Sequence, residues 1–199
     1  MKTTTKLVCT LSILMLFLMT SCASTKVTGE WKDPNLTDKP FEKILVMGIA
    51  KQPSDRRFYE DEFVRQLKSK GVMAISSHTL IQHENMWDRE TIVQTLGSKD
   101  FDSVIITRVV DTKARQQYSN FNSNMYDYYS SSYAIVPYYR RGKTTYQQKF
   151  GFESNLYDAK TEKLVFSLSS DTYAQDNINK RLGSYIKTLV DKLVQYNLL

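Results

Sequence analysis

Two histidines, His78 and His83, are the first residues to weigh for metal or acid–base chemistry, because the chain has no others. They lie five residues apart, with Glu84 next to the second, whereas two ligands on one helical face are expected at a spacing of four. The only cysteines are Cys9 and Cys22. The residues therefore predict no metal site, and we expect no cofactor.

Serine chemistry is the next possibility, since Ser54, Ser76 or Ser77 could be combined with His78 and an aspartate. No Gly-x-Ser-x-Gly turn, which would expose a nucleophilic serine, is present. The simpler interpretation is that residues 76–80 form a solvated loop at the carboxyl end of a strand.

The carboxylates do not form an obvious acid–base pair. Asp61 and Glu62 are sequence neighbours in a predicted helix, so their side chains point to different sides and are typical of a solvated face. Asp171 and Asp176 flank the end of a predicted hairpin, where we expect them to form the turn and to cap the last helix. The sequence predicts no catalytic residue.

A phosphate-binding loop would be expected after the first strand, where the chain reads Gly48-Ile49-Ala50-Lys51-Gln52-Pro53-Ser54. One glycine does not match either glycine-rich nucleotide fingerprint. The basic pairs of the chain are dispersed, which does not favour nucleic acid as a partner.

Tyrosines are concentrated in one segment, Thr112 to Thr145, which holds seven of the thirteen in the chain among Ser and Asn residues. Tyrosine gives a large contact area at low cost in side-chain entropy, so this composition is typical of binding loops. The predicted contact residues, for an envelope protein or a glycan, are Tyr126, Tyr128, Tyr129, Tyr133, Tyr138 and Tyr139. The alternative is an insertion that only covers the sheet.

Residues 1–21 have the three parts of a secretory signal peptide: a short basic start, an apolar run from Leu7 to Met19, and small residues before Cys22. The apolar run has about 13 residues, whereas a spanning helix needs roughly 20. Met19-Thr20-Ser21-Cys22 resembles the lipobox of bacterial lipoproteins, although methionine replaces the usual leucine. The alternative is an ordinary signal peptide that ends near a cysteine.

The resemblance to a lipobox implies that Cys22 carries the lipid that holds the protein at a membrane. Ala23 follows, where an aspartate would be an inner-membrane retention signal, so the outer membrane is favoured. Removal of Lys2 and Lys6 lowers the net charge from +6 to +4. Residues 22–40 are polar and are expected to form a tether, unless the part from Glu30 forms an edge strand held by Trp31.

Residues 41–199 are expected to form a single domain with an insertion at 112–145. The pattern of apolar residues predicts strands at 43–49 and 72–75, helices around 59–67 and 88–97, a third strand at 101–110, a hairpin of 147–157 with 163–173, and an amphipathic last helix. In the first helix we place Glu60 and Asp61 on the solvated side. The fold class is α/β, one mixed sheet with the order β-α-β-α-β, insertion, hairpin, helix.

Three short segments carry a further resemblance. Trp31 to Pro34, Leu156-Tyr157-Asp158 and Leu164-Val165-Phe166 resemble segments of a family of uncharacterised bacterial lipoproteins, over most of the predicted mature chain. In outline the order of elements also looks like the α/β domains of envelope lipoproteins that assist larger assemblies. These resemblances imply a fold and a location but no activity.

The sequence therefore favours a membrane-anchored binding or assembly module without catalysis. The alternative is a periplasmic small-ligand binder or enzyme that uses the carboxyl ends of the strands, in which case Arg56, Arg57, His78 and Asp111 should converge. A mainly structural envelope protein is the third hypothesis.

Overall fold

The computed structural model describes residues 25–36, 39–82, 89–97, 100–110, 124–135, 149–173 and 178–199. The predicted signal peptide and Cys22 lie outside these residues. Within them, no helix is both long enough and apolar enough to cross a membrane.

The described elements follow the predicted order closely. In chain order they are β1 (Thr25–Lys32), β2 (Lys43–Ile49), α2 (Pro53–Ser69), β3 (Met73–Ser76), the 3-10 helix η1 (Ser77–Thr79), α3 (Arg89–Gly97), β4 (Ser103–Val110), α4 (Met125–Ile135), β5 (Lys149–Asp158), β6 (Leu164–Tyr173) and α5 (Ile178–Gln195).

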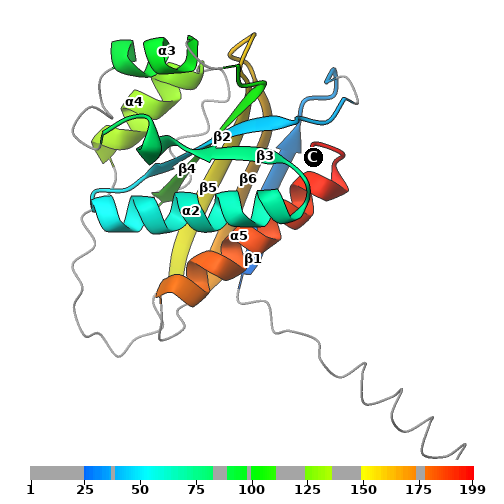
Figure 1. Cartoon of the computed structure of the whole chain (residues 1–199). Coiled ribbons are helices and arrows are strands. Elements are labelled where there is room, and N and C mark those ends of the chain that lie inside the picture. Colours follow the sequence, from blue (N-terminus) through cyan, green and yellow to red (C-terminus); the bar gives the residue numbers. More distant parts are fainter. Residues whose placement is uncertain are drawn as a thin grey trace, which may run out of the picture.

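The strands form one mixed sheet in the order β1-β6-β5-β4-β2-β3 (Figure 1). β2 runs parallel to both β3 and β4, and the remaining pairs are antiparallel. The predicted α/β fold with a mixed sheet is confirmed. The carboxyl ends of the parallel strands therefore lie at the same edge of the sheet as the start of β5 and the start of β1.

Two hydrophobic clusters cover the two faces of this sheet, because alternate residues of a strand point to opposite sides. Ile105 and Leu156 belong to the cluster under α2 and α5. Ile106 and Tyr157 belong to the cluster that includes Ile92 of α3 and the buried tyrosines of α4. The central strands β4 and β5 are thus covered from both sides.

The amphipathic pattern of the last helix is confirmed. Its buried residues, among those described, are Leu182, Tyr185, Ile186, Leu189, Val190 and Leu193. Full burial of such a side chain contributes roughly 1.5–3 kcal/mol, so this stripe is a main source of the stability of that face.

β1 corrects the predicted tether. Residues 25–32 form an edge strand along β6, which is the alternative we considered, but the strand begins five residues earlier than Glu30. Trp31 is 38% exposed, so the indole does not hold the strand by burial. The backbone pairing with β6 and the side chain of Thr25 do so instead.

α4 corrects the interpretation of the tyrosine-rich segment as binding loops, because residues 125–135 of it form a helix. Asn124 caps the helix, since its Oδ1 accepts hydrogen bonds from the backbone N–H groups of Tyr126 at 3.1 Å and Asp127 at 3.0 Å. The helix turns Tyr126, Tyr128 and Tyr129 into the core.

Candidate functional site

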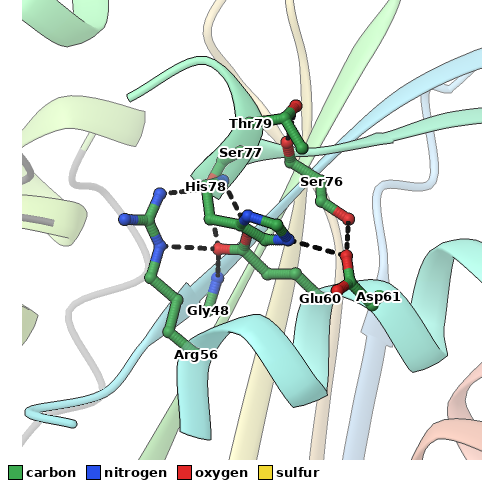
Figure 2. A network of polar contacts seen from close by, with 8 residues as sticks. All are labelled: Gly48, Arg56, Glu60, Asp61, Ser76, Ser77, His78 and Thr79. Carbon is green, nitrogen blue, oxygen red and sulfur yellow. Dashed lines mark hydrogen bonds and ion pairs between the residues drawn. The ribbon is translucent and has the colours of Figure 1, made fainter. Parts of the chain in front are cut away.

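The polar side chains of highest interest gather where β2 and β3 end, between α2 and η1 (Figure 2). Pro53 begins α2, a position where its fixed φ and missing N–H suit a helix start. This edge of a parallel strand pair is where open α/β sheets bind ligands. It is therefore the first place to look for chemistry.

Glu60 is the centre of this site, and its side chain is completely buried. Its Oε1 accepts hydrogen bonds from the Gly48 backbone N–H at 2.9 Å and the Ser77 hydroxyl at 2.7 Å. Its Oε2 accepts one from the His78 backbone N–H at 2.7 Å. The carboxylate thus joins β2, α2 and η1.

Arg56 supplies the counter-charge from one turn earlier in α2. Its Nε lies 3.0 Å from Glu60 Oε1, and both side chains are almost fully buried, at 1% and 0% exposure. The same guanidinium donates to Ser77 Oγ at 2.9 Å. Removing one partner of such a buried pair is strongly destabilising, because the other charge stays behind unpaired.

Two predictions are wrong at this point. Glu60 does not belong to the solvated side of α2, because it is buried against the end of β2. Residues 76–80 do not form a solvated loop, because Ser76 ends β3, Ser77 begins η1, and both are buried. The physical reason is the same for both: the buried carboxylate and its donors satisfy one another inside the protein.

Asp61 and His78 form the outer part of the site. His78 Nε2 lies 2.6 Å from Asp61 Oδ1, and the His78 side chain is 17% exposed while that of Asp61 is 60% exposed. Ser76 Oγ donates to the same Asp61 oxygen at 2.8 Å. Partial burial acts to raise the pKa of Asp61, but the hydrogen bonds from His78 and Ser76 outweigh it, and the pKa is lowered.

The geometry of Ser76, His78 and Asp61 differs from that of a nucleophilic triad. In a triad the serine hydroxyl donates to the histidine, which can then remove its proton. Here the serine and the histidine both donate to Asp61, so the carboxylate lies between them. The arrangement holds η1 on α2 and does not activate Ser76.

The four residues of the ligand-binding hypothesis are only partly brought together. The Arg56 side chain and the His78 backbone N–H both donate to Glu60, whereas the His78 ring contacts Asp61. Arg57 is exposed and acts on Asp61 through its charge. Asp111 lies outside the described residues.

The remaining chemical candidates do not join this network. Ser54 is exposed in the first turn of α2. His83, Glu84 and Asp176 lie outside the described residues. Asp171 is buried inside β6 and does not form a turn, contrary to our expectation. Among the residues that the structure describes, no group of three or more His, Cys, Asp or Glu side chains could hold a metal ion.

Three of the six predicted contact tyrosines are core residues. Tyr126, Tyr128 and Tyr129 are 7%, 7% and 2% exposed. A side chain buried to this extent cannot form a contact surface in this structure. Tyr133 belongs to α4, but its side chain lies outside the described part of the chain, as do Tyr138 and Tyr139 entirely.

Sequence reasoning missed a second, partly buried ion pair beneath α4. Arg108 of β4 donates to both carboxylate oxygens of Glu153 in β5, at 3.1 and 3.3 Å, and these residues are directly opposite in the sheet register. The Tyr128 hydroxyl donates to Glu153 Oε1 at 2.7 Å, and the guanidinium lies 5.1 Å from the Tyr128 ring centre. Burial and the neighbouring Glu153 raise the pKa of Tyr128 well above its usual value.

No protein-family model matches the chain, and no curated protein matches it. The resemblance to uncharacterised lipoproteins therefore stays an expectation.

Among solved structures, the chain is similar to two PelC dodecamers from Paraburkholderia phytofirmans. One, a variant, has a TM-score of 0.49 and 10% identity over 85% of this chain and 96% of that chain. The other has a TM-score of 0.47 and 11% identity over 87% and 97%. Lipoprotein GNA1162 from Neisseria meningitidis gives a TM-score of 0.40 and 13% identity over 77% and 96%. Similarity at this level carries no conclusion about activity or assembly.

Proposed function

We propose that this protein is an envelope lipoprotein, anchored through a lipid on Cys22, that acts as a binding or assembly module without catalysis. The observation that carries the proposal is the lipobox-like Met19-Thr20-Ser21-Cys22 after a short signal-type apolar run, directly before the first strand of the domain. The outer membrane is the favoured location, because Ala23 follows the cysteine.

The described polar sites support a role without catalysis. Glu60 is surrounded by four donors, and Asp61 accepts from both Ser76 and His78, so these groups are used to hold α2, β2 and η1 together. A general base needs access to the proton that it removes. Glu60, at 0% exposure, has none in this structure.

The contact surface for an envelope protein or a glycan must differ from the one predicted. With Tyr126, Tyr128 and Tyr129 in the core, the contact role falls to Tyr133, Tyr138 and Tyr139. Their aromatic rings would supply contact area to a protein or stack on sugars.

The anchor is tested by growing cells with a fatty-acid analogue that can be detected after incorporation. We expect the intact protein to be labelled and to remain in the membrane fraction, and the Cys22→Ser variant to be unlabelled. Label on the Cys22→Ser variant, or none on the intact protein, would contradict lipidation at this cysteine.

The binding role is tested by crosslinking in cells followed by capture of the protein. The triple variant Tyr133→Ser, Tyr138→Ser and Tyr139→Ser should lose a partner that the intact protein retains. Tyr128→Phe is the control, because it alters a buried tyrosine and should leave capture unchanged. Equal capture by the triple variant and the intact protein would move the contact surface elsewhere.

A small-ligand binder is the second candidate, favoured by the polar network of Arg56, Glu60, Asp61 and His78 at the carboxyl ends of β2 and β3. A ligand there would have to use the exposed side of Asp61 and His78, since Glu60 and Arg56 are enclosed. Thermal-shift screening of small cationic and polar compounds tests this candidate. A shift that disappears in Asp61→Asn would support it, and no shift would count against it.

A further inference from the structure

Thr25, the first residue of β1, is fixed to the domain by its side chain. Its hydroxyl lies 3.0 Å from Thr172 Oγ1 of β6 and 3.2 Å from Ser184 Oγ of α5, and the residue is only 8% exposed. The chain is therefore held in place from Thr25 onward. No flexible tether lies between this point and the rest of the sheet.

Cys22 is only three residues before Thr25. Even a fully extended chain spans at most about 3.6 Å per residue, so the Cα atoms of Cys22 and Thr25 are no more than roughly 11 Å apart. If Cys22 carries lipid, as proposed above, this end of the domain must stay next to the membrane surface. The present inference rests on that proposed function.

Three other elements have a terminus at this side of the domain: β6, β5 and α5. Thr25 lies opposite Thr172 near the end of β6, which in turn lies opposite Phe150 at the start of β5. The bond to Ser184 places the second turn of α5 beside them. Figure 1 shows the starts of β1, β5 and α5 at the lower end of the domain.

Exposed lysines flank this end on both sides of the sheet. Thr25 faces α5, so Lys26, the next residue, points to the opposite face. Lys180 lies one turn before Ser184 on α5, and both lysines are exposed. Asp171, which pairs with Lys26 in register, is buried at 5% exposure, and Asp176 is the acidic residue of the segment 174–177.

The opposite end of the hairpin differs in its charge. The turn between β5 and β6 carries Lys160 and Lys163, but also Asp158 and Glu162. At the anchor end, by contrast, the acidic residue opposite Lys26 in the sheet, Asp171, is buried. A surface of this kind is complementary to anionic phospholipid headgroups.

We infer that the end of the domain at which β1 begins lies against the membrane, and that Lys26 and Lys180 bind anionic phospholipid headgroups there. The short connection to Cys22 keeps this end of the domain close to the membrane, and the two lysines bind it to the membrane surface. Each basic residue near an anionic surface strengthens binding by about fivefold. Loss of both should therefore weaken the docked state on the order of 25-fold.

The orientation is tested with the lipidated protein in vesicles that contain lipids with a quencher in the headgroup region. Cys22 is blocked by its lipid, so one introduced cysteine carries the fluorophore. Gly183→Cys places it beside Ser184, where an added Cβ meets nothing within 4 Å. Lys160→Cys places it in the β5–β6 turn, about 30 Å along the hairpin.

We expect the fluorophore at position 183 to be quenched strongly and that at position 160 weakly, in vesicles with about one third phosphatidylglycerol. Equal quenching at the two positions would overturn the orientation.

The role of charge is tested with two matched pairs of substitutions in the protein labelled through Gly183→Cys. Lys26→Gln with Lys180→Gln should reduce quenching at position 183 in phosphatidylglycerol vesicles. The protein without these two substitutions should likewise be quenched less in neutral phosphatidylcholine vesicles. Lys160→Gln with Lys163→Gln removes the same charge at the far end and should have no effect. Quenching that is unchanged by Lys26→Gln with Lys180→Gln would overturn the headgroup contact.

Failure of this inference is distinguishable from failure of the proposed function. Absence of fatty-acid label on Cys22 would refute the anchor. Normal lipidation, combined with equal quenching at positions 183 and 160, would refute only the orientation.

Discussion

Glu60 shows how one buried carboxylate can determine the arrangement of three elements. It has four donors within 3.0 Å from β2, α2 and η1. Glu60→Gln keeps the shape of the side chain but leaves the charge of Arg56 buried without a counter-ion. We expect a loss of about 3–5 kcal/mol in the free energy of unfolding, measured with urea.

Glu62→Gln is the matched control for this prediction. Its partner Arg65 has a side chain that is 68% exposed, so solvent screens the pair and its loss should change stability little. If Glu60→Gln cost no more than Glu62→Gln, the ion pair with Arg56 would not hold the site together.

The sequence could not identify Glu60 as a buried residue, because Arg56 and Glu60 have the i,i+4 spacing of an ordinary surface pair. One signal was present at Gly48, a glycine inside an otherwise apolar strand, which often marks a close approach. A Cβ at Gly48 would lie 2.8 Å from Tyr59 Cδ1 and 3.6 Å from Glu60 Cγ. The missing side chain is what admits α2, and with it Glu60, to the end of β2.

Asp61 predicts a pH dependence of stability. Its pKa in the folded protein is below the ordinary value of 3.8, so between the two pKa values the unfolded state binds more protons. The stabilisation is therefore complete at neutral pH and is lost as the pH falls through the folded pKa.

This dependence is measured by urea unfolding of the native protein and of Asp61→Asn at pH 7 and near pH 3. We expect the native protein to be more stable at pH 7 and the difference between the two proteins to shrink at the lower pH. A difference of the same size at both values would show that the charge of Asp61 is not responsible.

At the scale of elements, helices and strands with a regular apolar pattern could be predicted from the sequence. The strand at β1 was considered only as an alternative, and the helix α4 was not predicted. The hairpin, β2 and α5 follow from alternating or helical apolar patterns. β1 and α4 have few aliphatic residues, and their structure depends on partners that are distant in sequence. Thr25 needs Thr172 and Ser184, and Tyr128 needs Glu153.

Tyr128 allows the role of α4 to be tested. Tyr128→Phe retains the ring above Arg108 but removes the hydrogen bond to Glu153, so we expect a loss of about 1.5–3 kcal/mol. Tyr128→Ser also removes the ring and should cost about 3–5 kcal/mol. Thermal unfolding followed by circular dichroism measures both.

Ser131→Ala, on the exposed side of the same helix, is the comparison and should change stability by roughly 0.5 kcal/mol or less. If Tyr128→Ser were as stable as Ser131→Ala, the tyrosine would not be a core residue. The prediction that Tyr128 contacts a partner would then stand again.

At the scale of the whole molecule, the two hydrophobic clusters share one sheet. The cluster under α2 and α5 and the cluster under α3 and α4 use alternate residues of β4, such as Ile105 and Ile106. Because β4 contributes side chains to both clusters, loss of packing on one face also weakens the strand on which the other cluster packs. The domain is therefore expected to unfold as a single cooperative unit.

Leu189→Ala tests this cooperativity from the α5 side. Leu189 is completely buried, so its truncation should cost about 2–5 kcal/mol. The same loss of free energy should appear in urea unfolding followed by circular dichroism and in the hydrogen-exchange stability of the β4 amides. We expect this even though α4 and its tyrosines cover the other face of β4. Val194→Ala changes the same helix at a residue that is 46% exposed and should cost roughly 0.5 kcal/mol or less. Unchanged protection of β4 in Leu189→Ala would mean that the face beneath α4 unfolds independently, and the shared sheet would then not couple the two clusters.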